Sequence, residues 1–238
     1  MNNPAPLGAD ANGAAVRRLM RGRATATLAT QLAGSGWPYA SLVLVATAID
    51  GAPLLLLSRL AEHTKNMAGD ARISLLFDGT EPGPSRLAGS RATVLGRATR
   101  SADKAELGRF LARHPEAEAY AGFADFGLFR IAVERAHLVA GFGRIHWVDE
   151  REILLPQSAV AAFVASETKL VATLNDDAAV RTLLAQKLGP GEWSVTGADP
   201  EGVDTRADGA TARLSFADAL ADPAAIRAAL DSATTTPV

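Results

Sequence analysis

The stretch Pro53–Asn66 reads PLLLLSRLAEHTKN, and it joins an apolar run to a short polar segment. The apolar run stops at Ser58, and a second one, Ile73–Phe77, follows the polar segment. This pattern predicts a strand that delivers hydroxyl and cationic side chains to the start of a helix. Because a helix start offers free N–H groups and a positive dipole end, the segment suits an anionic group such as phosphate. An amphipathic turn with a solvated charged face is the alternative, and the local residues leave both interpretations open.

Strands are predicted on the N-terminal side of this stretch. Ala24–Leu32 and Tyr39–Ile49 are rich in small, β-branched and apolar residues, and the turn-forming cluster Gly34–Pro38 separates them. An Asp-Gly pair then predicts a hairpin turn before Pro53. Strands joined by tight turns are antiparallel neighbours, which favours a meander or barrel over alternating βαβ units.

The remaining elements of the first 150 residues continue this pattern. The arginines of the first predicted helix are interpreted as a solvated face, and Ser101 is the candidate N-cap of the second. Gly89 and Gly96 are predicted bend or bulge points in one long strand. The predicted helices are Ala14–Arg23 and Asp103–His114, and the predicted strands are Ala71–Phe77, Ser85–Arg100, Leu128–Ala140 and Gly141–Val148.

A change of composition near Asp149–Pro156 predicts two domains, one over residues 1–150 and one over residues 156–238. The first is β-rich and the second is a small α+β unit, so the fold class is α+β. The second unit is predicted to hold a mainly helical Gln157–Gly189, short strands at Trp193–Ala198, Val203–Arg206 and Ala210–Phe216, a terminal helix at Asp222–Leu230, and a tail.

The bulk composition excludes several classes of function. The net charge is −2 and no dense basic stripe is present, which argues against nucleic acid as the main partner. With no cysteine, disulfides, thiolate catalysis and cysteine-based metal sites are excluded, and the four histidines show no metal-ligand spacing. The N-terminus lacks the pattern of a secretory signal, and no apolar run reaches the roughly 18 residues of a membrane span. A cytoplasmic protein without a metal site is therefore expected.

Four segments together carry a family resemblance: Trp37–Ser41, Ser58–Asn66, Ala71–Phe77 and Gly141–Trp147. They resemble the split-barrel flavoproteins related to pyridoxamine 5'-phosphate oxidase. The branch they resemble is the haem-utilisation type, which carries an appended C-terminal domain. The resemblance implies an antiparallel, FMN-binding split β-barrel that forms a homodimer, with the flavin at the subunit interface.

The resemblance also implies which residues hold the cofactor. Ser58, His63, Thr64 and Lys65 match positions that hold the FMN phosphate in such proteins, and Ser41 matches a strand position near the flavin. The chemistry agrees, because a dianionic phosphate needs several donors and Lys65 would supply a charge-assisted one. No catalytic side chain is assigned.

One departure from the family affects the functional prediction. The appended domain commonly carries a His-Met-Asn-x-Asp-His pattern, whereas here Thr173 and Ala178 stand at the histidine positions. A role in metal or haem contact that needs those histidines is therefore in doubt. His146 is a candidate axial haem ligand, and a structural histidine is the alternative.

Three functions follow as hypotheses. The leading one is an FMN-dependent oxidoreductase whose substrate the sequence does not identify. The second is a haem-binding or haem-degrading protein on the same fold. The third is a non-catalytic binding or dimerisation scaffold, since a fold does not determine a function.

Overall fold

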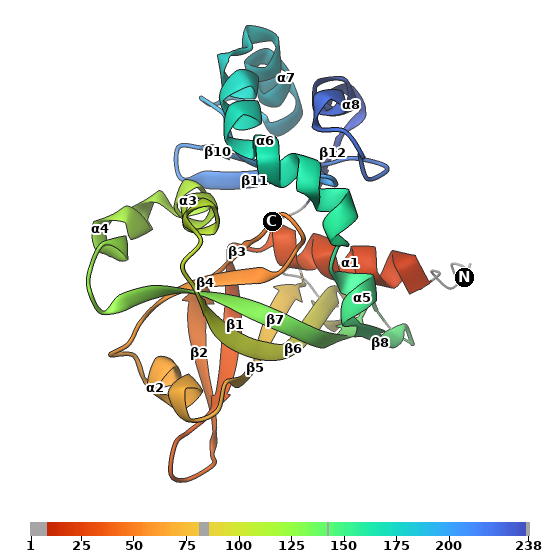
Figure 1. Ribbon diagram of the computed structural model, residues 1–238. Coiled ribbons are helices and arrows are strands. Elements are labelled where there is room, and N and C mark those ends of the chain that lie inside the picture. The colour runs from red at the N-terminus through yellow and green to blue at the C-terminus, as the bar shows by residue number, and fades with distance from the viewer. Residues whose placement is uncertain (1–8, 81–85, 142, 237–238) are drawn as a thin grey trace.

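The chain folds around a curled antiparallel sheet, which is followed by a smaller sheet with its own helices (Figure 1). The computed structural model describes residues 9–80, 86–141 and 143–236. Within them the first sheet has the order β2-β1-β5-β6-β7-β4-β3, with β8 paired to β7 and every pairing antiparallel. This arrangement confirms the predicted α+β split barrel. Its strands are β1 (Thr25–Gln31), β2 (Pro38–Leu44), β3 (Ala46–Thr47), β4 (Pro53–Ser58), β5 (Arg72–Gly79), β6 (Ser90–Ser101), β7 (Phe126–Val139) and β8 (Ile145–Asp149).

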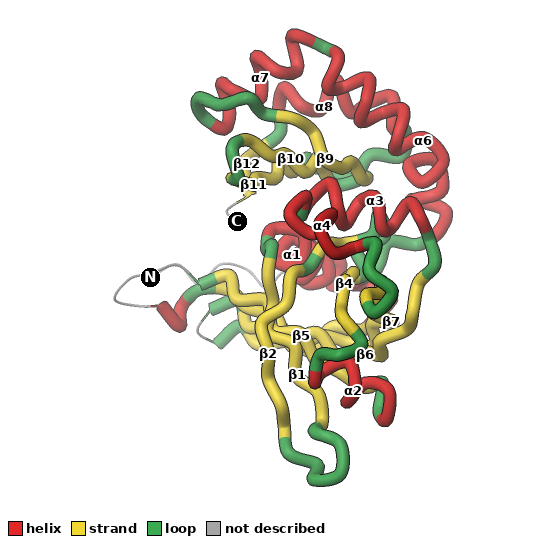
Figure 2. Tube along the Cα trace, turned by 90° about the vertical axis from the view of Figure 1, so that its left-hand side faces the viewer, coloured by secondary structure: helices red, strands yellow, loops and turns green. Residues whose placement is uncertain are grey.

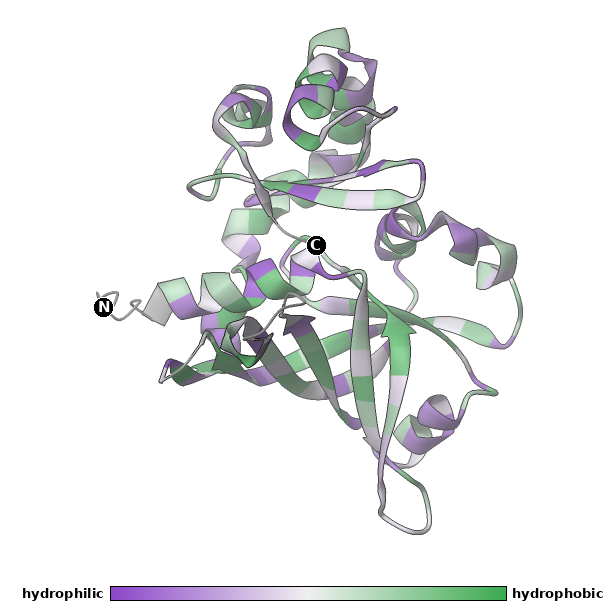
Figure 3. Ribbon diagram, turned by 180° about the vertical axis from the view of Figure 1, so that it is seen from behind, coloured by the Kyte–Doolittle hydropathy of each residue, from purple (hydrophilic) through white to green (hydrophobic). Residues whose placement is uncertain are grey.

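Strand β4 has the predicted bounds, and its unbroken apolar run has a structural reason. Successive strand residues point to opposite faces, so a continuous run needs apolar surroundings on both. Leu55 and Leu57 belong to the core inside the barrel, whereas Leu54 and Leu56 pack in a second cluster with Phe110. Strand β1 instead alternates buried and exposed residues, as expected for a sheet with one buried face. Hydrophobic and hydrophilic colours accordingly alternate along several strands in Figure 3.

Strand β6 differs in part from the strand that the sequence predicts over Ser85–Arg100. Ser85 lies outside the described residues, and the strand begins at Ser90, so Gly89 precedes it instead of bending it. The predicted bulge at Gly96 is confirmed, because the pairing with β7 shifts register between Leu95 and Gly96. A Cβ at Gly96 would collide with the backbone of the neighbouring strand, so only glycine fits this close approach.

Helices cover the two ends of the barrel. Asp103, and not Ser101, is the N-cap of α3, since the carboxylate of Asp103 accepts from the N–H groups of Ala105 and Glu106. Ser101 ends β6 and donates to the carboxylate of Glu106 at 2.7 Å. None of the helices in the described residues is both long and apolar enough to cross a membrane. The helices around the barrel are α1 (Ala9–Gly22), α2 (Glu62–Gly69), α3 (Lys104–Arg113), α4 (Glu118–Ala121) and α5 (Glu150–Ile153).

The second sheet carries three helices on one face (Figure 2). The predicted helix Gln157–Gly189 is two helices, because Asp177 ends the first and caps the second by accepting from the N–H of Ala179. The predicted C-terminal tail adds an edge strand beside β11. The elements are α6 (Gln157–Asp176), α7 (Ala178–Leu188), α8 (Ile226–Ser232), β9 (Ser194–Asp199), β10 (Gly202–Ala207), β11 (Ala210–Ser215) and β12 (Thr234–Thr236), in the sheet order β12-β11-β10-β9.

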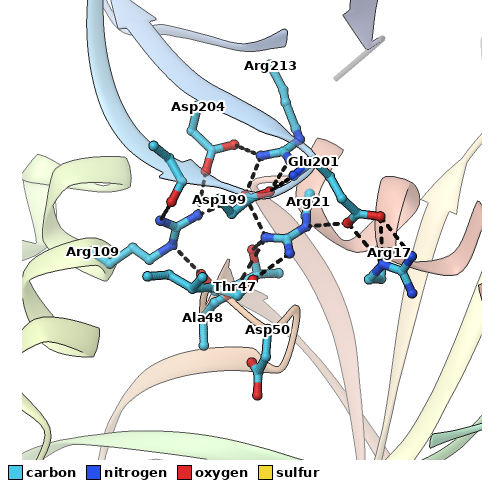
Figure 4. A network of polar contacts seen from close by, with 12 residues as sticks. Arg17, Arg21, Thr47, Ala48, Asp50, Arg109, Asp199, Glu201, Asp204 and Arg213 are labelled. Carbon is cyan, nitrogen blue, oxygen red and sulfur yellow. Dashed lines mark hydrogen bonds and ion pairs between the residues drawn. The ribbon is translucent and has the colours of Figure 1, made fainter. Parts of the chain in front are cut away.

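A buried network of charged side chains joins the second sheet to α1 and α3 (Figure 4). Asp199 at its centre accepts from Arg21 of α1 and Arg213 of β11, both at 2.8 Å, and from Arg109 of α3 at 3.3 Å. Arg17 pairs with Glu201 at 2.8 Å. The prediction that the arginines of the first helix form a solvated face is therefore wrong for Arg17 and Arg21, which are buried. The predicted domain limits, 1–150 and 156–238, stay a prediction.

Candidate functional site

Helix α2 begins one short turn after β4, so the end of the apolar run determines where the helix lies. In this turn the backbone N–H of Ala61 donates to the carbonyl of Ser58 at 3.1 Å. The N–H groups of Thr64 and Lys65 donate to the carbonyl of Ala61 at 3.1 and 3.2 Å. The predicted sequence of strand, polar turn and helix start is thus present.

His63 and Asn66 lie one helical turn apart and attach α2 to the β1–β2 hairpin. The Oγ atom of Ser41 lies 3.1 Å from Nδ1 of His63. Asn66, which is 1% exposed, donates to Oγ1 of Thr30 at 3.0 Å and accepts from the N–H of Ala33 at 3.1 Å. Burial lowers the pKa of His63 below its ordinary 6.5, which favours the neutral imidazole. This face of α2 is therefore used to hold the helix on the hairpin, which projects at the lower end of Figure 1.

Other residues of α2 line a pocket of about 410 Å³. Three of the lining side chains are cationic and none is acidic, so the pocket favours an anion. Its remaining wall is mostly apolar. The lining residues are Arg59, Thr64, Lys65, Met67, Ala68, Ala98, Arg100 and Phe129.

Thr64 lines this pocket and carries a buried hydroxyl without a partner among the described residues. Its Oγ1 atom is buried, and no described residue forms a hydrogen bond with it. Buried polar groups nearly always have a partner, and leaving one unpaired costs about 1–3 kcal/mol. Together with the three cations of the pocket, this unpartnered hydroxyl gives a donor set that fits a phosphate.

Two of the three cations, Arg59 and Arg100, were not predicted as site residues. Arg59 lies inside the segment Ser58–Asn66 that carries the family resemblance, so its position in the sequence was a usable signal. Arg100 had no local signal, because it stands at the far end of β6 and reaches the pocket through sheet pairing with Phe129. Its guanidinium carbon lies 5.4 Å from the centre of the Phe129 ring, within the range of a cation–π contact.

The five predicted site residues fall into two groups. Thr64 and Lys65 line the pocket. Ser41 and His63 contact each other at the hairpin, and the Ser58 hydroxyl donates to Asp125 at 2.5 Å. Two of the five residues thus line the pocket, and the other three contact residues outside it. The assignment of all five to FMN stays a prediction.

The residues that match the pattern of the appended domain have structural contacts. Asn175 forms two hydrogen bonds with the backbone of Val195, at 2.7 and 2.9 Å, which attach α6 to β9. Thr173 and Ala178, which replace the histidines, are exposed. No group of three or more side chains that could hold a metal ion comes together among the described residues.

His146 lies on β8 opposite Leu138 and is half-buried. Its neighbour Trp147 packs on His137, with ring centroids 4.8 Å apart. The role of His146 as a haem ligand stays a prediction.

The sequence comparisons point to one family. The profile described as pyridoxamine 5'-phosphate oxidase matches residues 13–140, which is more than half of the chain. A relative, the chloroplastic non-canonical heme oxygenase of Arabidopsis thaliana, is 35% identical over 109 residues. That match covers 44% of this chain and 33% of the relative, so it spans about a third of the relative's length.

Two solved structures are similar over nearly the whole chain. A protein of unknown function from Agrobacterium tumefaciens has a TM-score of 0.78 and 27% identity, with 97% of this chain and 100% of that chain covered. A heme binding protein from Mycobacterium smegmatis has a TM-score of 0.55 and 27% identity, with 98% and 97% covered. The similarity therefore includes the second sheet as well as the barrel.

Proposed function

The chain belongs to the pyridoxamine 5'-phosphate oxidase family, in its haem-utilisation branch, and from this premise we propose that it is an FMN-binding flavoprotein and a flavin-dependent oxidoreductase. One observation carries the proposal: Thr64, whose buried hydroxyl has no partner among the described residues, lines a pocket with three cationic side chains and no acidic one. In this proposal the FMN phosphate contacts Thr64 and Lys65, with Arg59 and Arg100 beside it.

The chemistry of the pocket suits a phosphate joined to a less polar group. Charge-assisted hydrogen bonds from guanidinium and ammonium groups are stronger than neutral ones, and several are needed for a dianion. Thr64 and Lys65 also lie in the first turn of α2, where the positive end of the helix dipole favours negative charge. Met67, Ala98 and Phe129 offer apolar contacts beyond the charged end. When bound, the flavin supplies the redox chemistry, and these residues bind and orient it.

Lys65→Ala is expected to weaken FMN binding about tenfold, because it removes one charge-assisted donor from the phosphate. The affinity is measured by quenching of flavin fluorescence with the purified full chain. Lys169→Ala removes an exposed lysine from α6 and is the matched control, with no expected change.

A wild-type protein that takes up no FMN, together with no difference between wild type and Lys65→Ala, would contradict the proposal. Haem binding is the second candidate, and it is supported by the 35% identity to a heme oxygenase. A haemin titration in parallel, with a Soret shift but no FMN uptake, would favour this candidate. Bound FMN that neither NADH nor NADPH reduces would favour a scaffold without catalysis.

We also propose a homodimer, with the flavin at its subunit interface. The supporting observation is a row of residues across the outer face of the first sheet, which the strand register aligns from β2 to β8. Leu42 is 75% exposed and Trp147 is 56% exposed in this row, and Leu76 lies between them. Large apolar side chains exposed together on a sheet face favour association with another protein surface. The full row is Leu42, Thr27, Leu76, Thr93, His137 and Trp147.

Leu42→Glu is expected to shift the protein from dimer to monomer, because it replaces an exposed apolar side chain of this row with a charged one. Sedimentation equilibrium of the wild type and the variant measures the mass. Thr235→Glu, on the exposed edge strand of the second sheet, is the control and should leave the mass unchanged. A monomeric wild type, or a dimer that Leu42→Glu leaves intact, would refute this interface.

A further inference from the structure

We propose that the start of strand β7 positions both arginines of the α2 pocket, with Asp125 holding Arg59 and Gly127 making room for Arg100. This inference rests on the proposed phosphate site and adds two positioning residues to it. Neither Asp125 nor Gly127 lines the pocket. Both act through contacts with residues that do.

Asp125 holds the turn that carries Arg59 by two separate hydrogen bonds. Its carbonyl accepts from the backbone N–H of Arg59 at 2.7 Å. Its carboxylate accepts from the Ser58 hydroxyl at 2.5 Å, and the oxygen of that hydroxyl accepts from the N–H of Leu60 at 3.1 Å. Three consecutive residues are thus tied to one aspartate that is remote in the sequence, and the direction in which the Arg59 side chain leaves the backbone is determined.

Gly127 lies under the guanidinium of Arg100. It pairs with Leu57 in the β4–β7 ladder, which is extended backbone that alanine also adopts. A Cβ atom added at Gly127 would lie 3.0 Å from Nη2 and 3.1 Å from Cζ of Arg100. The Phe129 ring, two residues further along β7, provides the other contact of the guanidinium. The missing side chain therefore creates the space in which Arg100 rests.

Fixed arginines bind an anion better than mobile ones. A free arginine side chain loses much rotamer freedom on binding, whereas one already held in place loses less. Gly127 and the Phe129 ring reduce this cost at Arg100, and Asp125 fixes the backbone from which the exposed Arg59 side chain extends. Since both cations would contact the phosphate and not the flavin ring, positioning them should raise selectivity for a phosphorylated ligand over the same ligand without phosphate.

The test compares FMN with riboflavin, which lacks the phosphate. Gly127→Ala should displace the Arg100 guanidinium and lower FMN affinity about tenfold, with riboflavin affinity unchanged. Asp125→Ala, which removes the carboxylate that accepts from the Ser58 hydroxyl, should lower FMN affinity in the same selective way. Gly122→Ala is the matched control, since a Cβ there meets nothing within 4 Å, and both affinities should stay at the wild-type values.

The outcomes distinguish a failure of this positioning role from a failure of the proposed phosphate site. A wild type that binds FMN no tighter than riboflavin would remove the phosphate site, and this inference with it. A wild type that prefers FMN, with the preference retained in both Gly127→Ala and Asp125→Ala, would overturn the positioning role alone. Equal losses for both ligands, with a lowered melting temperature, would indicate general destabilisation and would likewise overturn it.

Discussion

Asp199→Ala is expected to lower the free energy of unfolding by about 3–5 kcal/mol, because it removes the central anion of a buried ion network. Asp199 is 0% exposed and contacts Arg21, Arg109 and Arg213. Without it, these guanidiniums stay buried next to one another with fewer opposite charges. Urea unfolding of the full chain, followed by circular dichroism, measures the change.

Glu134→Ala is the control for this prediction. Glu134 pairs with Arg97 at 3.0 Å, and both side chains are more than half exposed. Exposed ion pairs contribute little to stability, so Glu134→Ala should lower the free energy of unfolding by no more than about 1 kcal/mol. If Asp199→Ala cost no more than Glu134→Ala, the network would not be a main tie between the second sheet and the barrel.

The pH dependence of stability provides a second measurement on the same group. Burial alone would raise the pKa of Asp199, but the charges of Arg21 and Arg213 outweigh burial and hold it well below its ordinary 3.8. Because the folded-state pKa is depressed, the unfolded state binds the proton first as the pH falls. The stabilisation is therefore present above pH 3.8 and lost progressively below it. Asp199→Ala should flatten the acid limb of the stability profile.

Asn66→Ala is the substitution with the second largest expected effect. It should lower the free energy of unfolding by about 2–4 kcal/mol. The substitution leaves the Thr30 hydroxyl and the Ala33 N–H without the partner that each has in the wild type. It also releases α2 from the β1–β2 hairpin, so FMN affinity should fall together with stability. Urea unfolding and a fluorescence titration measure the two effects on the same preparation.

A double-mutant cycle with Thr30→Val tests the origin of this loss. If the Asn66–Thr30 hydrogen bond stabilises the fold, the double variant should lose about 1 kcal/mol less free energy of unfolding than the two single variants lose together. Strict additivity would mean that the amide of Asn66 acts elsewhere.

Local sequence pattern predicted most strands of the barrel, but the single strand predicted over Tyr39–Ile49 is two strands, β2 and β3, at opposite ends of the sheet order. The apolar run Pro53–Leu57 and the Asp50-Gly51 turn before it determine strand β4 and its hairpin with β3, because an apolar run and a tight turn are properties of neighbouring residues. The motif after Ser58 predicted a helix start, and Thr64 and Lys65 do line the pocket at that place. These features need no knowledge of distant parts of the chain.

The contacts of the charged residues could not be predicted from local sequence pattern. Arg17 and Arg21 look like a solvated helix face, yet their carboxylate partners Glu201 and Asp199 lie 184 and 178 residues away in the sequence. The sequence around α1 contains no signal for these partners, so burial of the two arginines could not be predicted. The same holds for Ser58, whose partner Asp125 lies 67 residues away.

The stretch Pro53–Asn66 therefore determined by itself a strand, a polar turn and the start of a helix. Only the tertiary structure decided what each polar side chain contacts. His63 and Asn66 face the hairpin, Thr64 and Lys65 face the pocket, and Ser58 is taken by Asp125. The physical reason is that periodicity is a local property of the chain, whereas a hydrogen bond or ion pair depends on which distant segment the fold brings alongside.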